Sequence, residues 1–295
     1  CEMVVATTGF FDGLHLGHRK VLDKLISIAE EQQGQSMIIS FWPHPRTVLQ
    51  QEAYKLRLLT TLEEKRELCF SLGIDRFEVI CFDKEFSQLN TEEFFRQYLV
   101  DKYNVSTLVI GYDHRLGHGK DERDIMEIAT SCGIRAVRVD QFQVGERVIS
   151  STAIRNRLLE GDISSANEWL GYRYSLHGVV ISGNRLGRTI GFPTANMQLY
   201  EPLKLIPANG VYFVSVEVTG GTYKGICNIG TRPTVSNDSS RKIETHILDF
   251  DEEIYGLDIK ISFIERLRDE RRFGSLEELH RQLLLDKECC IKKIL

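Results

Sequence analysis

Two histidines stand three residues apart in a glycine-containing segment close to the start of the chain. Residues 8–18 read TGFFDGLHLGH and connect an apolar run to a helical pattern. Glycines let the backbone approach a ligand closely, and the N-terminus of a helix attracts anions. His15 and His18 can donate hydrogen bonds to phosphate oxygens without carrying a fixed charge. The segment therefore predicts a phosphate-binding turn that would also include Gly9, Phe10, Asp12, Gly13 and Gly17.

A second segment that is rich in hydroxyl groups lies much further along the chain. Residues 149–155 read ISSTAIR, so Ser151 and Thr152 open a helical pattern and Arg155 follows within its first turn. Two hydroxyls and an arginine at a helix start make another anion-binding end. Taken singly, the serines could be ordinary N-caps, and the histidines could cap a helix, pack in a core or bind a metal. The metal reading loses weight because no Cys, Asp or Glu stands at ligand spacing with the histidines.

Together the two segments resemble the HxGH and SSTxxR signatures of the nucleotidyltransferase superfamily, which binds ATP and transfers its adenylyl group. Two further segments, FWPHP at 41–45 and GYDHRLG at 111–117, follow predicted strands, where α/β sheets bind ligands. As isolated turns they would be unremarkable, but here they look like parts of the flavin-adenylylating domain of bacterial bifunctional riboflavin kinase/FMN adenylyltransferases, or FAD synthetases. The resemblance implies flavin contacts at His44 and Asp113. His114 and Leu116 replace the aromatic residues of the usual pattern.

This reaction would not require a strong protein base. The phosphate of FMN is already anionic at neutral pH, so its attack on the α-phosphorus of ATP needs alignment and stabilisation of the phosphoryl oxygens. His15, His18 and Arg155 can supply these, and we take them as the catalytic residues. Mg²⁺ would bridge the phosphates that leave as pyrophosphate.

A glycine- and arginine-rich segment occupies residues 183–196 in the second half of the chain. It lacks the GxxxxGK[ST] spacing, which excludes a Walker phosphate loop. Gly183 and Arg188 could close over phosphates, although a flexible surface hairpin explains the composition equally well. The residues FPTAN at 192–196 closely resemble the PTAN motif of riboflavin kinases. That resemblance implies that Thr194 and Asn196 hold Mg²⁺ and the ATP phosphates.

A glutamate interrupts an alternating apolar segment further on. Glu244 lies in ETHILDF at 244–250, and this motif, NIGTRPT at 228–234 and Tyr255-Gly256 match the same family in order. An isolated strand glutamate is usually a solvated residue. Riboflavin, however, presents a neutral hydroxyl, so phosphoryl transfer gains from a base that accepts its proton. The resemblance implies that Glu244 is this base, and that Arg268 in the charged segment 267–273 contacts the flavin.

The elements that must position these residues differ between the two halves. In the first half, apolar runs at 3–8, 36–41, 77–82, 107–111 and 135–139 alternate with helical patterns. This order predicts a doubly wound α/β domain with a parallel sheet, of the Rossmann-like nucleotidyltransferase type. Helical cues include a stripe of apolar residues between 21 and 29, and a capping box formed by Thr61 and Glu64.

After a helical bridge at 151–170, interrupted at Gly161, the apolar period changes to two. Segments at 211–218, 223–227, 243–250 and 259–264 predict an antiparallel β-barrel or sandwich, and the resemblance favours the riboflavin kinase barrel. A terminal helix follows, with a capping box at Ser275 and Glu278 and an apolar face of Leu276, Leu279 and Leu283. We therefore expect an adenylyltransferase domain at 1–170 and a kinase domain at 171–295.

Composition excludes several other classes of protein. Of 295 residues, 27% are charged and 42% hydrophobic, and the net charge of −5 comes without clusters of Lys and Arg, so we expect no nucleic-acid partner. Apolar segments are too short to cross a membrane, and no basic segment followed by an apolar one opens the chain. The seven cysteines form no CxxC pair, which suggests reduced thiols. We expect a cytoplasmic protein with no membrane partner.

The sequence thus predicts a Mg²⁺-dependent enzyme that makes FMN from riboflavin and ATP in its C-terminal barrel, and FAD from FMN and ATP in its N-terminal domain. One competing interpretation is a nucleotidyltransferase that acts on another phosphorylated metabolite, against which the motifs of the second half argue. The other is a flavin-binding sensor with an inactive first site, suggested by His114 and Leu116. A turnover assay distinguishes the sensor from the enzyme.

Overall fold

A computed structural model of the chain divides into two compact units, residues 1–151 and residues 152–295. The structure describes residues 3–49, 56–112, 124–140, 143–144, 147–183, 191–231 and 241–293. The two predicted helices at 151–170 fall almost entirely in the second unit. The functional boundary near residue 170 stays a prediction.

The first unit is built on a parallel sheet with the strand order β3-β2-β1-β4-β5. Its strands are β1 (Val4–Thr8), β2 (Gln35–Trp42), β3 (Arg76–Cys81), β4 (Val105–Ile110) and β5 (Arg135–Arg138). Each lies within two residues of an apolar run recognised in the sequence. The chain runs outward from β1 to one edge and then returns through β4 to the other, so the order reverses between β1 and β4. Ligands bind α/β sheets at this position, beyond the carboxyl ends of the strands.

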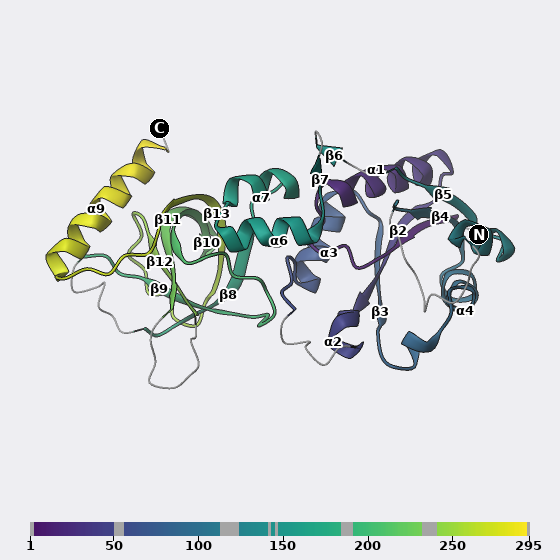
Figure 1. Cartoon of the computed structure of the whole chain (residues 1–295), viewed down its shortest axis with the longest axis horizontal. Helices are drawn as coiled ribbons and strands as arrows, with labels where there is room; N and C mark the ends of the chain where they lie inside the picture. Colours follow the sequence, from purple (N-terminus) through teal and green to yellow (C-terminus); the bar gives the residue numbers. More distant parts are fainter. Residues whose placement is uncertain are drawn as a thin grey trace. The chain divides into compact units, whose positions relative to one another are not determined.

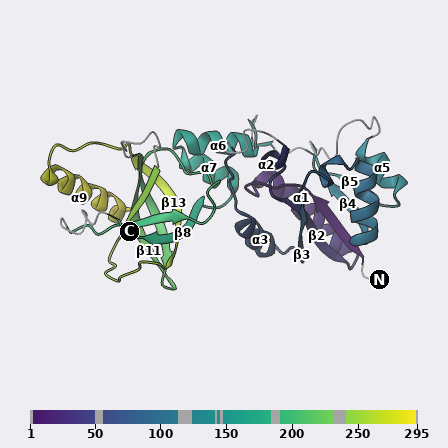
Figure 2. The same ribbon diagram turned by 90° about the horizontal axis from the view of Figure 1, so that it is seen from below.

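Helices cover both faces of this sheet, as Figures 1 and 2 show. Val5 packs with Leu22 and Leu25 of α1 on one face, whereas Val4 packs with Phe95 and Leu99 on the other. The helices are α1 (Leu16–Glu31), α2 (Pro45–Leu49), α3 (Leu62–Ser71), η2 (Phe86–Gln88), α4 (Thr91–Phe94), η3 (Phe95–Lys102) and α5 (Ile125–Ser131). A short hairpin of β6 (Gln143–Val144) and β7 (Arg147–Val148) precedes the second unit. The predicted doubly wound α/β fold is confirmed.

The second unit is a closed antiparallel barrel with the strand order β10-β11-β12-β9-β8-β13. It opens with α6 (Ser151–Glu160) and α7 (Ile163–Leu170), which Figure 1 shows beside the barrel. The strands are β8 (Ser175–Ile181), β9 (Ala195–Leu199), β10 (Gly210–Val218), β11 (Gly221–Thr231), β12 (Arg241–Ile247) and β13 (Asp258–Arg268). The predicted barrel is confirmed, with β8 and β9 as strands that the sequence pattern did not reveal.

The terminal helix α9 (Leu276–Lys292) forms as expected, although its first turn differs from the prediction. Ser275 caps it by accepting a hydrogen bond from the Glu278 N–H at 3.2 Å, yet the Glu278 carboxylate accepts from the Gly274 N–H and not from Ser275, so the reciprocal box does not form. The expected apolar face is confirmed in part: Leu279 and Leu283 are half-buried, whereas Leu276, at the start of the helix, is 48% exposed. Asp286 and Cys290 are the buried residues, because an ion pair to β13 and a small cluster on β10 and β11 orient the helix.

None of the described helices combines the length and the apolar character that crossing a lipid bilayer requires.

Candidate active sites

The two histidines of the N-terminal turn stack on one another at the start of α1. His15 is the N-cap residue, and its Nδ1 accepts a hydrogen bond from the His18 N–H at 3.3 Å. A ring nitrogen that accepts carries no proton, so the proton of a neutral His15 is on Nε2, which can donate to an anion. The two ring centroids lie 3.6 Å apart, with an angle of 19° between the planes. A Cβ at Gly17 would lie 3.1 Å from the His15 ring, which explains the glycine of the motif.

The His18 imidazole is neutral at pH 7. Burial lowers its pKa well below the usual value, and the nearby His15 and Lys65 lower it further. Its Nδ1 is buried and has no hydrogen-bond partner among the described residues. The stacked pair therefore offers ring N–H donors, with a neutral imidazole at His18, at the positive end of a helix, which suits a phosphate group.

Asp12 braces the turn against the segment that leads into α3. Its carboxylate accepts hydrogen bonds from the N–H groups of Leu59 and Thr60 at 3.0 Å each and from the Thr60 hydroxyl at 3.2 Å. The Gly13 N–H in turn donates to that hydroxyl at 3.0 Å. Sequence reasoning missed Thr60, since nothing in its neighbourhood distinguishes it from an ordinary loop residue. The Asp12 side chain thus has a bracing role, and its predicted contact with phosphate stays a prediction.

Two of the distant motifs meet the N-terminal turn. The Ser151 hydroxyl donates to the Asp12 carbonyl at 2.8 Å, and the His44 ring lies edge-on to the Phe10 ring with centroids 3.9 Å apart. The residues predicted from separate segments are thereby brought together at the carboxyl end of β1. Asp113 and Arg188 lie outside the described residues. Thr152 and Arg155 stand on α6 within the second unit, and their roles stay predictions.

In the barrel, Glu244 occupies the middle of a polar row that crosses three strands. It is the direct register partner of Asn196 on β9 and of Asn228 on β11. Directly opposed residues of antiparallel strands share one face of the sheet. All three are partly exposed, whereas the neighbouring Thr245 and Cys227 are fully buried on the other face. The row therefore lies on the outside of the barrel, where a substrate can reach it.

Tight contacts fix the neighbouring FPTAN segment. The Nδ1–H of His246 on β12 donates a hydrogen bond to the Pro193 carbonyl oxygen, at 2.8 Å. The Phe192 ring packs against His246 and against His280 of α9, with centroid distances of 4.9 and 5.6 Å. Burial lowers the pKa of His246, so this contact involves a neutral ring. His246 thus holds Phe192 and Pro193, which directly precede Thr194, and the sequence did not reveal this contact.

Gly183 packs directly on the amide of Asn196. A Cβ at this position would overlap the Asn196 side chain. Asn196 also has Ile181 of β8 as its register partner, so it is held between β8 and β12. The structure therefore brings Gly183, Asn196 and Glu244 together, as the sequence predicted for the kinase half.

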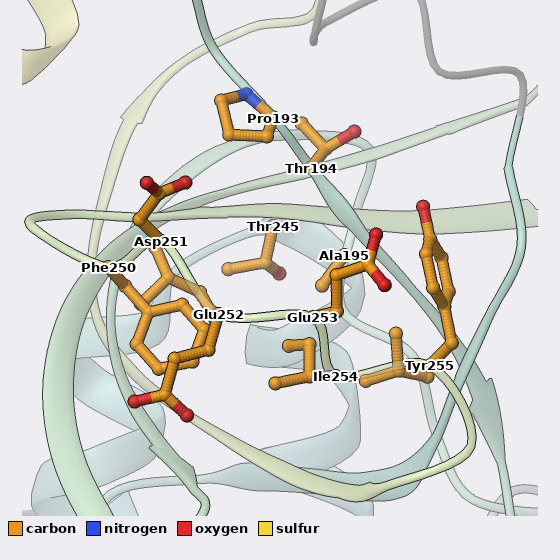
Figure 3. A pocket seen from close by; sticks show the side chains of 12 residues that line it. Pro193, Thr194, Ala195, Thr245, Phe250, Asp251, Glu252, Glu253, Ile254 and Tyr255 are labelled. Atoms are coloured by element: carbon orange, nitrogen blue, oxygen red, sulfur yellow. The ribbon is translucent and has the colours of Figure 1, made fainter.

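A cavity of about 300 Å³ lies next to Thr194. Figure 3 shows Thr245 in the middle of its wall, with the carboxylates of Asp251 and Glu253 on either side and Phe250 and Tyr255 at the margins. The Thr245 hydroxyl is buried and has no hydrogen-bond partner among the described residues. A buried hydroxyl of this kind is available to a ligand.

Arg268 is held by a protein carboxylate. Its Nη2 lies 2.7 Å from Oδ2 of Asp286, and its Nε donates to the same group at 3.0 Å, so the pair is bidentate and largely buried. The following Glu270 packs against Gly230 of β11 and places this segment over the strand that carries Asn228. The guanidinium thus anchors the segment to α9, and its predicted flavin contact stays a prediction.

Comparison with known proteins relates each half of the chain to a family. The FAD synthetase family model matches residues 1–153, and the riboflavin kinase family model matches residues 170–294. The bifunctional riboflavin kinase/FMN adenylyltransferase of Bacillus subtilis (strain 168) is 38% identical over 291 residues, covering 98% of this chain and 92% of the relative. The chain belongs to the bifunctional riboflavin kinase/FMN adenylyltransferase family.

Another relative and a solved structure also match nearly the full chain. The relative from Listeria monocytogenes serovar 1/2a is 39% identical, covering 96% of this chain and 90% of its own length. A crystal structure from Streptococcus pneumoniae, described as a macrolide-efflux protein, is 28% identical with a TM-score of 0.89 and covers 97% of this chain and 93% of its own. The family and the fold predicted from the sequence are both confirmed.

Proposed function

We propose that the chain phosphorylates riboflavin to FMN in its barrel and adenylylates FMN to FAD in its N-terminal unit, with ATP as co-substrate in both steps. The observation that carries this proposal is that each half matches its own family model and holds its own assembled polar site. The curated relatives named for both activities align over nearly the full chain. Nothing in the comparisons favours the sensor alternative.

In the kinase step, Glu244 acts as the base. Its carboxylate makes no hydrogen bond to another side chain of the described residues, so it is available to a substrate hydroxyl. As the riboflavin hydroxyl oxygen forms a bond to the γ-phosphorus of ATP, its proton passes to Glu244 and the bond to ADP breaks. Asn228 and Asn196, its register neighbours, are placed to orient the reacting groups.

The barrel site suits Mg²⁺ in the company of ATP. The Asn196 amide packs directly against Gly183, and Thr194 stands two residues away, beside the cavity. Oxygen ligands of this kind, completed by phosphates and water, are what Mg²⁺ prefers. No group of three His, Cys, Asp or Glu side chains among the described residues is arranged to hold a metal ion. Bound Mg²⁺ would neutralise charge on the transferred phosphoryl group.

The cavity beside Thr194 is the proposed site for part of the ATP molecule. At about 300 Å³ it is at the small end of ligand pockets, which fits a fragment of the nucleotide. Thr245 offers it a buried hydroxyl, and Phe250 and Tyr255 offer aromatic surface. Because Thr194 borders this cavity, a nucleotide held there would direct its phosphates toward the Thr194–Asn196 site.

In the adenylylation step, the anionic phosphate of FMN attacks the α-phosphorus of ATP and pyrophosphate leaves. The Nε2–H of His15 and the neutral ring of His18 are the proposed donors to the oxygens on which charge accumulates. Thr152 and Arg155 are proposed to add a hydroxyl and a fixed positive charge, following the family motif. Since the stacked imidazoles are already ordered against each other, little reorganisation is required when charge develops.

Incubation with riboflavin, ATP and Mg²⁺, followed by chromatography of the flavins, tests both steps. FMN should appear first and FAD second, with ADP and pyrophosphate as the other products. FMN supplied without riboflavin should yield FAD alone, which separates the two sites. The absence of both flavin products would refute the proposal. A cytoplasmic location stays a prediction.

A further inference from the structure

Lys65 is a fully buried lysine in contact with the N-terminal turn. It stands in the first turn of α3 and is 0% exposed. Its Nζ donates a hydrogen bond to the Phe10 carbonyl at 2.5 Å and lies 3.8 Å from the centroid of the Phe10 ring. Lysine is almost never fully buried unless its charge is paired, so this position requires a physical reason.

The charge of Lys65 is not neutralised by an ion pair. Among the described residues no carboxylate forms a salt bridge with its Nζ, and the Asp12 carboxylate nearby is engaged by Leu59 and Thr60. The Phe10 carbonyl and ring therefore provide the principal protein contacts of this ammonium group. The Asp12 carboxylate stabilises the buried cation without forming a salt bridge, and burial still lowers the pKa of Lys65. An anion bound at the adjoining turn would offset more of the cost of burying this charge.

We propose that Lys65 is a positioning residue for adenylyl transfer, which ties the Phe10 carbonyl back from the anion site and provides a positive charge behind the phosphates of ATP. The inference rests on the function proposed for the N-terminal unit. Phe10 leads directly into the turn that Asp12 braces and His15 ends, so its carbonyl must be satisfied away from an incoming phosphate. Without the ammonium group, that carbonyl oxygen would lose the hydrogen bond that Lys65 donates.

The titratable groups around Lys65 have pKa values that differ from its own. Asp12 faces Lys65 from the N-terminal turn, and Cys69 faces it from the next turn of α3. His18 faces it from the start of α1, where His15 lies beside His18. Burial raises the pKa of the Cys69 thiol to about 12, and the pKa of His18 lies well below its usual value. Burial lowers the pKa of Lys65 to about 8, although Asp12 opposes this shift.

We expect FAD formation to decline at alkaline pH. Lys65 is protonated below a pH of about 8 and loses its charge above it. If only the protonated protein binds ATP productively, kcat/KM for FAD formation falls about tenfold for each pH unit above that value. FMN formation in the same chain has no such dependence, because Lys65 is remote in sequence and belongs to the other unit.

The test compares pH profiles from 7 to 9.5 for FAD formation from FMN and for FMN formation from riboflavin. The wild-type protein should show the alkaline decline in FAD formation alone. Lys65→Met, similar in length but uncharged, should raise KM for ATP, lower kcat/KM roughly tenfold or more below pH 8, and remove the alkaline decline. Lys65→Arg should keep the charge and carry the activity past pH 9. Lys24→Met, at an exposed lysine of α1, is the matched control and should behave as wild type.

Two results would overturn the role of Lys65 while leaving the proposed adenylyltransferase function intact. One is wild-type FAD formation with no decline up to pH 9.5, which requires no variant and therefore holds even if Lys65→Met does not fold. The other is a folded Lys65→Met protein that retains the alkaline decline, which would assign it to another group. A wild-type protein that makes no FAD from FMN at any pH would overturn the proposed adenylyltransferase function as well.

Discussion

A single methyl group at Gly183 should disable the kinase site without disturbing the fold. Gly183 does not have a positive φ, so alanine is allowed by its backbone. The added Cβ would overlap the amide of Asn196, which β8 and β12 hold on either side. Because the overlapping atoms belong to the Asn196 side chain and its backbone is paired on both sides, the Asn196 amide must rotate away from its position beside Glu244.

The expected loss follows from the size of that displacement. Relief of a clash with a heavy atom requires a movement of about 1 Å, and misplacement of a catalytic group by that distance costs on the order of 10²-fold in rate. Gly183→Ala should therefore lower FMN formation from riboflavin roughly 10²-fold and raise the Mg²⁺ concentration needed for half-maximal activity. FAD formation from supplied FMN should continue at the unmodified rate and show that the chain is folded.

Gly274→Ala is the matched control for this substitution. A Cβ there would meet only Glu278, at an ordinary contact distance of 3.6 Å, and the φ of Gly274 is likewise not positive. It should leave FMN formation unchanged. If Gly183→Ala produced FMN at the unmodified rate with unchanged Mg²⁺ dependence, Asn196 would not be part of the phosphate and metal site.

Three further predictions concern the two sites and their separation. His18→Ala removes a charge-stabilising donor and should slow FAD formation from FMN roughly 10²-fold or more, with riboflavin phosphorylation retained; unchanged FAD formation would remove this residue from the site. Glu244→Gln keeps size and hydrogen bonding but not basicity, so FMN formation should collapse while ATP still binds in a calorimetric titration; normal FMN formation would make it a structural strand residue. A fragment of residues 171–295 should phosphorylate riboflavin unaided but unfold at lower urea than residues 152–295, because Asn167 of α7 hydrogen-bonds two backbone groups of the barrel segment. Equal urea midpoints would show that α6 and α7 contribute nothing to barrel stability.

Much of the fold could be predicted because its signals are local. The strands of the first sheet are short apolar runs, and strands that are buried on both faces need such continuity. Thr61 caps α3 with the reciprocal hydrogen bonds expected from Thr61 and Glu64, since a capping box involves only four consecutive residues. The change of apolar period after α7 likewise marks where parallel sheet gives way to barrel.

Other elements could not be predicted because long-range pairing decides them. Strand β9 begins at Ala195 inside a motif whose Phe192 and Pro193 suggest a rigid turn, and it exists because β8 and β12 pair with it. The leucines of α9 indicated the face that turns toward the barrel, but not the Arg268–Asp286 ion pair and the buried Cys290 that hold this face in place. A hydrophobic pattern records what a helix could bury, and only the partner surface determines what it does bury.

The same division applies to the sites. The residue types of the HxGH turn by themselves indicated anion binding, helix capping, core packing or a metal site, and the resemblance of both motifs to known families implied which chemistry the chain performs. Tertiary structure decided that Glu244 faces Asn196 across a register of strands 48 residues apart in the chain. It also decided that Lys65, which a helix of this composition would normally turn toward water, is buried against Phe10. Burial and register depend on segments distant in sequence, and so does the electrostatic environment that sets how each group acts.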